Sequence, residues 1–143
     1  MIWTEQLLWS SAVAFAVMIA LWLIQIATGK VAVVDVGWSA VIGGSFVFYA
    51  LTGDGNPQRR WIAAAMGALW ALRLGYHMLV NRVLTSHEDG RYKQWRQDFP
   101  PSKFQTVMLA FFVAQAVTVP LLAAPHLINA HNSAPLGPLD FAA

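Results

Sequence analysis

Four apolar runs constrain this chain more than any other feature of its sequence. They cover residues 7–28, 31–52, 61–80 and 104–124. At about 20 residues, each run is long enough to cross a hydrocarbon core about 30 Å thick as a helix, and in lipid only a helix satisfies its own backbone polar groups. We therefore predict an all-α fold: a polytopic transmembrane bundle of about four helices, forming a single domain over residues 1–143.

Composition agrees with a membrane protein and excludes several other classes. Only 11% of the residues are charged and 57% are hydrophobic, whereas a soluble domain carries about 25% charged residues. The net charge of +2 gives no sign of nucleic-acid binding. The lack of cysteine excludes disulfides, thiolate catalysis and cysteine-based metal sites. The four histidines lack the spacing of metal ligands.

The basic residues predict how the chain crosses the membrane. One side carries Lys30, Arg82, Arg91, Lys93, Arg96 and Lys103. The other side carries only Arg59 and Arg60. Because loops rich in Lys and Arg stay in the cytoplasm, we expect the N-terminus outside and the 81–103 loop in the cytoplasm.

Three ionisable residues lie within the apolar runs, where each costs about 3 kcal/mol on insertion scales and usually has a partner or a task. Asp35 and His77 lie about one turn from the cytoplasmic end of their runs, and Arg73 is one turn deeper on the stripe of His77. We expect the three side chains to meet in the cytoplasmic half of the bundle. They form either a structural ion pair that fixes helix register, or part of a substrate or cofactor site.

The third run also carries small residues at intervals of four: Ala63, Gly67, Ala71 and Gly75. Such a stripe lets two helices approach closely in a membrane. We therefore predict close packing along this stripe, with Gly43 and Gly44 of the second run as the receiving surface.

The polar loop carries Glu88-Asp89-Gly90-Arg91-Tyr92 and, further on, Arg96. One interpretation is a solvated loop beside anionic lipid headgroups. The other is a phosphate clamp, in which Arg91 and Arg96 bind the phosphates of a dinucleotide while Glu88 or Asp89 orients them.

Four segments, in this order, resemble a known family. They are Val34-Asp35-Val36-Gly37-Trp38, Leu69-Trp70-Ala71-Leu72-Arg73-Leu74-Gly75 with His77 and Arg82, Glu88-Asp89-Gly90-Arg91-Tyr92, and Phe111-Phe112-Val113-Ala114-Gln115-Ala116. Over residues 31–143 the chain is similar to the bacterial branch of the steroid 5-alpha-reductase-like membrane family, a branch labelled a domain of unknown function. The resemblance implies an NADPH-dependent oxidoreductase that reduces a double bond in a lipid-like (steroid or enone) small molecule, in a bacterial inner membrane.

The resemblance also implies site residues. Asp35 and Tyr76 are the catalytic candidates, and Arg73, Asn81 and Arg82 are expected to face the cofactor together with the clamp arginines. No metal site is expected. A non-enzymatic membrane scaffold or a lipid-binding remnant is the alternative.

The end of the chain resembles the entry into a fifth helix. We expect a polar loop after Pro125, then a helix start near Pro135. Family members continue into a second half that supplies most cofactor contacts, so the chain is expected to be the N-terminal part of a longer domain. Its expected partners are the lipid bilayer, a lipid-like small molecule and a complementary C-terminal half.

Overall fold

The computed structural model describes residues 1–85 and 89–137, and its described residues contain five α-helices and one π-helical turn. The helices are α1 (Trp3–Thr28), α2 (Val33–Thr52), α3 (Pro57–Met78), α4 (Gly90–Asp98) and α5 (Pro101–Ala130), and the π-helical turn η1 (Leu79–Val83) continues α3. Four of them, with α3 extended through η1, are long and apolar enough to cross a membrane. The predicted all-α bundle is confirmed, and these helices fit an integral membrane protein.

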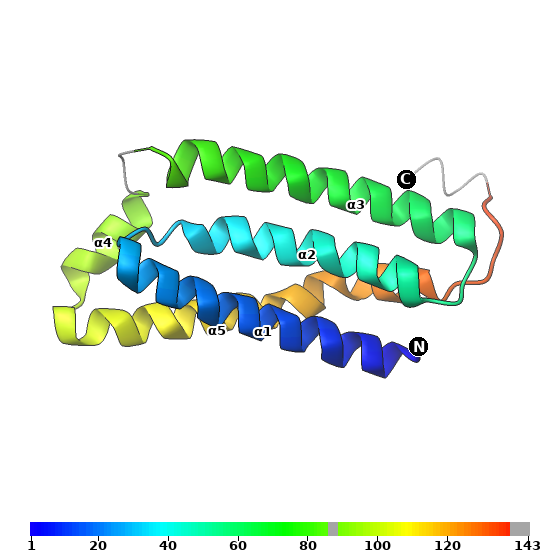
Figure 1. Cartoon of the computed structure of the whole chain (residues 1–143), viewed down its shortest axis with the longest axis horizontal. Helices are drawn as coiled ribbons and strands as arrows, with labels where there is room; N and C mark the ends of the chain where they lie inside the picture. The colour runs from blue at the N-terminus through cyan, green and yellow to red at the C-terminus, as the bar shows by residue number, and fades with distance from the viewer. Residues whose placement is uncertain (86–88, 138–143) are drawn as a thin grey trace.

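The four long helices lie side by side, and the short helix α4 lies across one end of the bundle (Figure 1). The N-terminus and the end of α5 lie at the opposite end (Figure 1). Helix α2 is central, because it packs against α1, α3 and α5. Half of its apolar stretch is buried, against 17% of the corresponding stretch in α1 and in α3. We refer below to the α4 end and the N-terminal end of the bundle.

The small-residue stripe of α3 packs on α2 as the sequence predicts. A Cβ built at Gly43 would lie 2.5 Å from the Cβ of Ala71, and one at Gly75 would lie 2.9 Å from Ser39 Oγ. A Cβ at Gly67 would overlap the ring of Phe46. Gly44 differs from Gly43, because a Cβ there meets nothing within 4 Å. Only the first glycine of the predicted receiving pair therefore contacts α3.

Helix α5 is longer than the sequence predicts. The fourth span was expected to cover residues 104–124 with a polar loop after Pro125, but the helix runs from Pro101 to Ala130 through two internal prolines. A proline removes one helical hydrogen bond, a loss that packing within a bundle can outweigh. Here Leu127 and Ala130 are buried, and the ring of His126 stacks on that of Phe46 at 3.6 Å between centroids. These contacts explain why the helix continues.

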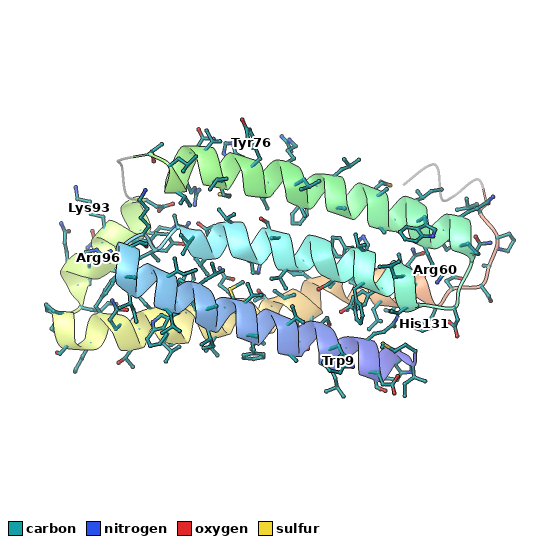
Figure 2. The ribbon with its side chains drawn as sticks, viewed as in Figure 1. Trp9, Arg60, Tyr76, Lys93, Arg96 and His131 are labelled. Carbon is teal, nitrogen blue, oxygen red and sulfur yellow. The ribbon has the colours of Figure 1, made fainter. Side chains whose placement is uncertain are left out.

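The N-terminal end of the bundle is held by polar contacts between distant segments. Gly55 N donates to Ala130 O at 2.9 Å, which joins the α2–α3 loop to α5. The ring of His131 bridges Asp54 and Gln6, at 2.6 Å on each side. Figure 2 shows His131 at this end, close to the start of α1. These contacts fix one end of α1, α2 and α5. Asp35 and the arginines that contact it lie at the opposite, α4 end.

Candidate functional site

The π-helical turn η1 sets the direction of Arg82. Leu84 N donates to Leu79 O at 2.9 Å, a bond from residue i+5 to residue i. Arg82 lies within this wider turn, and its side chain reaches Asp35 of α2, while Asn81 Nδ2 donates to His77 O at 2.9 Å. Such wide turns are frequent at functional sites, and the hydrophobic pattern of the sequence gives no sign of this one.

Asp35 is the centre of a polar cluster at the α4 end. Its carboxylate accepts a hydrogen bond from Arg82 Nη1 at 3.3 Å and from the Tyr92 hydroxyl, which lies 3.3 Å from both oxygens. Arg91 Nη2 lies 3.8 Å from Asp35 Oδ2. The Asp35 side chain is only 13% exposed. The carboxylate also lies in the first turn of α2, where the helix dipole favours negative charge.

Asp89 closes the cluster on the side of α4. Its carboxylate lies 2.8 Å from Arg82 Nη1 and accepts hydrogen bonds from Arg91 Nε and Nη2 at 3.1 and 3.2 Å. It also caps α4 by accepting from Arg91 N at 3.0 Å. Two carboxylates and two guanidinium groups thus alternate in one network. We call Asp35, Arg82, Asp89, Arg91 and Tyr92 the α2–α4 cluster.

Tyr92 connects this cluster to a group of packed aromatic side chains. Its side chain is fully buried, and its ring lies 6.1 Å from that of Trp95 and 6.0 Å from that of Phe111. Burial and the neighbouring Asp35 carboxylate raise the pKa of the Tyr92 hydroxyl. The phenol therefore stays protonated and donates to Asp35. Tyr92 belongs to a segment that carries the family resemblance, but the sequence alone predicts no role for it.

Acid is expected to loosen α4. Arg91 donates hydrogen bonds to Asp89 and so lowers the pKa of that carboxyl below its usual value. Because folding favours the ionised form, this contribution to stability is fully present above about pH 4 and is lost as the pH falls through the folded-state pKa. We expect amide hydrogen exchange in residues 89–98, corrected for its intrinsic pH dependence, to accelerate as the pH falls below about 4. Asp89→Asn should show the faster exchange already at pH 5 and a weaker change with pH.

The predicted meeting of Asp35 with Arg73 and His77 is wrong. Asp35 pairs with Arg82 and Arg91 instead, and Arg73 and His77 lie on the exposed side of α3. The physical reason is helical phase. The stripe that packs on α2 includes Gly75, and positions two residues away from a packed position lie on the opposite face of a helix.

The other candidate residues are dispersed. Tyr76 is 71% exposed and points away from the bundle (Figure 2). Asn81 is exposed and bonds within its own helix. Arg96 lies at the α4 end, where it donates to Gly29 O at 3.0 Å and covers the ring of Phe104 at 4.6 Å (Figure 2). Glu88, the predicted orienting acid, lies outside the described residues.

Two apolar spaces adjoin the central helix. A groove of about 650 Å³ lies between α1 and α2 and is lined by residues such as Val13, Val17 and Gly44. A cavity of about 400 Å³ lies among α2, α3 and α5, lined by Trp38, Ile42, Phe46, Met66, Gly67, Trp70, Leu122 and His126. Trp38, Ile42 and Phe46 lie on the same face of α2 as Asp35, because they follow it at positions +3, +7 and +11. The position of His126 in this lining could not be predicted from the sequence, which indicates a loop after Pro125. Over the described part of the chain, no three metal-ligating side chains gather.

The helices and the α2–α4 cluster define an integral membrane helix bundle with a paired-charge site at one end. The chain belongs to the family described as "Protein of unknown function (DUF1295)", which matches residues 21–143. The searches of curated proteins and of solved structures gave no match.

Proposed function

We propose that this chain is the membrane-embedded part of an NADPH-dependent reductase that acts on a double bond in a lipid-like molecule. The observation that carries the proposal is the α2–α4 cluster, which gathers two arginines and two carboxylates at the α4 end of the bundle. The resemblance to the steroid 5-alpha-reductase-like family supports the same function. Within this proposal the cluster binds and orients the cofactor, and the apolar space beside α2 receives the lipid.

The charges at the α4 end fit a phosphate-bearing dinucleotide. The described residues there include six cations and three carboxylates: Lys30, Arg82, Arg91, Lys93, Arg96 and Lys103 against Asp35, Asp89 and Asp98. Arg91 is 57% exposed, so its guanidinium can reach a ligand from water while Asp89 holds it in place. Guanidinium groups bind phosphate oxygens in a bidentate manner. The excess of positive charge and the pre-oriented arginines therefore suit a pyrophosphate and a 2′-phosphate.

Each residue of the cluster has a defined part in the proposal. Arg82 and Arg91 bind phosphate oxygens, and Arg96 extends this surface toward α1. Asp35 forms ion pairs with both cluster arginines and accepts a hydrogen bond from the Tyr92 hydroxyl. Its role in the proposal is therefore to orient the arginines, which contact the ligand. NADPH supplies a hydride when it is bound. Arg73, Tyr76 and Asn81 lie on the outward side of α3, and we assign them no contact with this cluster.

The lipid-like substrate would enter the cavity among α2, α3 and α5. This cavity has a volume of about 400 Å³, within the usual range for small-molecule sites. Trp38 and Trp70 line it together with apolar side chains, and Trp38 lies one helical turn from Asp35. The lining contains no residue of the α2–α4 cluster, and Trp38 is the lining residue that follows Asp35 most closely along α2.

NADPH should bind to the native protein when it is purified from its source membranes into lipid nanodiscs, and Arg91→Gln should weaken that binding about tenfold. The reason is the loss of a charge-assisted contact, for which about 1.4 kcal/mol corresponds to a factor of ten. Equilibrium dialysis measures both affinities, and NADH should bind more weakly because it lacks the 2′-phosphate.

Arg59→Gln is the matched control, because Arg59 lies at the N-terminal end and donates to Pro135 O. It should leave NADPH affinity unchanged. Equal loss of affinity in both variants would show that the overall charge of the protein, and not Arg91 itself, determines NADPH binding. Absence of NADPH binding to the unsubstituted protein would contradict the reductase proposal.

A lipid-binding protein without enzymatic activity is the second candidate. The groove between α1 and α2 favours it, because about 650 Å³ of apolar space opens beside membrane helices. This function predicts lipid that stays bound through purification together with no affinity for NADPH. Native mass spectrometry and the dialysis experiment therefore separate the two candidates.

We further propose that the N-terminus lies outside a bacterial inner membrane and that the α4 end lies in the cytoplasm. The six cations at the α4 end support this orientation. A protease added to sealed inside-out vesicles should cut within residues 81–103, and the same protease added to right-side-out vesicles should not. The reverse pattern of cleavage would invert the orientation.

A further inference from the structure

The outward face of α3 is unlike the surface that a helix presents to lipid. Its exposed side chains at intervals of four and three are Ile62, Met66, Leu69, Arg73, Tyr76 and Val80, which we call the outer stripe of α3. This is the spacing of the contact positions in a two-helix seam. Tyr76 is 71% exposed, Leu69 is 67% exposed and Met66 is 67% exposed. The stripe thus combines large apolar side chains with an arginine in the middle.

Arg73 lies near the middle of a candidate membrane span, which sets its depth in a bilayer centred on that span. The span from Pro57 to Val83 has 27 residues, and its central residue is residue 70. At a rise of 1.5 Å per residue, Arg73 is about 5 Å from the centre of the span and so about 10 Å inside a 30 Å hydrocarbon core. This depth leaves the guanidinium facing hydrocarbon at a cost of about 3 kcal/mol on insertion scales.

The described chain offers Arg73 no counter-ion. No hydrogen bond or ion pair joins it to another described residue, whereas Arg82, nine residues on, has two carboxylates. A second copy does not supply a counter-ion either. Two outer stripes facing each other across a two-fold axis would bring two Arg73 side chains together. The intramembrane acid Asp35 is already paired at the α4 end.

We infer that the outer stripe of α3 is an interface for a transmembrane helix other than the four described here, and that this helix brings a carboxylate to Arg73. Charge complementarity selects this occupant, because a carboxylate offsets the buried guanidinium and apolar side chains do not. The other residues of the outer stripe, on either side of Arg73, have the spacing that lets them pack against such a helix. The inference is independent of NADPH binding, since it concerns a face of α3 that the α2–α4 cluster does not use.

Lipid photolabelling of the unmodified protein in its source membranes tests the interface. A phospholipid with a diazirine in its acyl chain, activated by light and followed by peptide mass spectrometry, reports which side chains face lipid. We expect labelling at Leu23 on α1 and Leu121 on α5, which are 55% and 67% exposed, and loss of labelling on the outer stripe. Labelling of Leu69 and Tyr76 equal to that of Leu23 would overturn the inference.

Charge substitutions at Arg73 test the carboxylate. Arg73→Lys keeps the charge and should keep the stripe protected, whereas Arg73→Glu should expel the partner and raise labelling of the stripe to the level of Leu23. If the outer stripe stays protected from lipid labelling in Arg73→Glu, the inference that the partner helix supplies a carboxylate would be wrong.

Single cysteines at Leu69 and Tyr76, in a chain that has no cysteine of its own, distinguish the partner helix from other occupants of the stripe. Reaction with a water-soluble maleimide would indicate a water-filled ligand site. Disulfide-linked dimers would indicate a second copy. Either result would overturn the inference.

Discussion

Asp35→Ala is expected to destabilise the protein by about 2 kcal/mol. The substitution leaves Arg82, Arg91 and the buried Tyr92 hydroxyl without their shared acceptor. Removal of one member of a buried ion pair costs about 3–5 kcal/mol, and we take a lower value because the Arg82 and Arg91 side chains are 32% and 57% exposed. Chemical denaturation in detergent micelles, followed by circular dichroism, measures the change in the free energy of unfolding.

Two further variants separate the loss of a partner from the loss of a carboxylate. Asp98→Ala removes an exposed acid of α4 that accepts only from Gln94 among the contacts described, and it should change stability by less than about 0.5 kcal/mol. In Asp35→Ala, Arg82 loses one of its two carboxylate partners and keeps Asp89. Adding Arg82→Leu then removes a contact that Asp35→Ala has already broken, so the double variant should be more stable than the sum of the two single changes predicts. Equal effects of Asp35→Ala and Asp98→Ala would show that the cluster contributes nothing to stability.

Gly43→Ala is expected to destabilise the protein by about 2 kcal/mol, while Gly44→Ala should change stability by less than about 0.5 kcal/mol. The new Cβ at Gly43 would lie 2.5 Å from the Cβ of Ala71, too close for two carbon atoms, so α2 and α3 must separate. At Gly44 a Cβ meets nothing within 4 Å. The same denaturation experiment compares two neighbouring glycines with identical chemistry. Similar losses in both variants would contradict the packing of α2 on α3.

The sequence predicts the helices well because lipid leaves few alternatives. A run of about 20 apolar residues in a bilayer has to be a helix, and the small stripe around Gly67 correctly selects the face of α3 that meets α2. The extent of α5 was less predictable. Pro125 and the polar residues after it indicate a loop, and only the packed bundle reveals that Leu127 and Ala130 are buried.

The candidate site was predicted only in part. An acid within an apolar run requires a partner, which correctly directs attention to Asp35, but the sequence predicts Arg73 and His77 as its neighbours. Arg82 and Arg91 were expected only to face the cofactor, and the structure pairs them with Asp35. Two features lay beyond sequence reasoning. The π-helical turn redirects Arg82 without any marker such as proline, and the helical phase of Arg73 turns it away from α2 although its spacing from His77 is favourable. Both depend on how α3 is rotated against its neighbour.

The measurement that tests the central claim most directly is hydrogen exchange of the protein in nanodiscs, with and without saturating NADPH. If the α2–α4 cluster binds the cofactor, exchange should slow in residues 79–85 and 89–98 and stay unchanged in the α2–α3 loop at residues 53–56, at the other end of the bundle. Unchanged exchange around Arg82 and Arg91, or protection confined to the N-terminal end, would contradict the assignment of this cluster as the cofactor site.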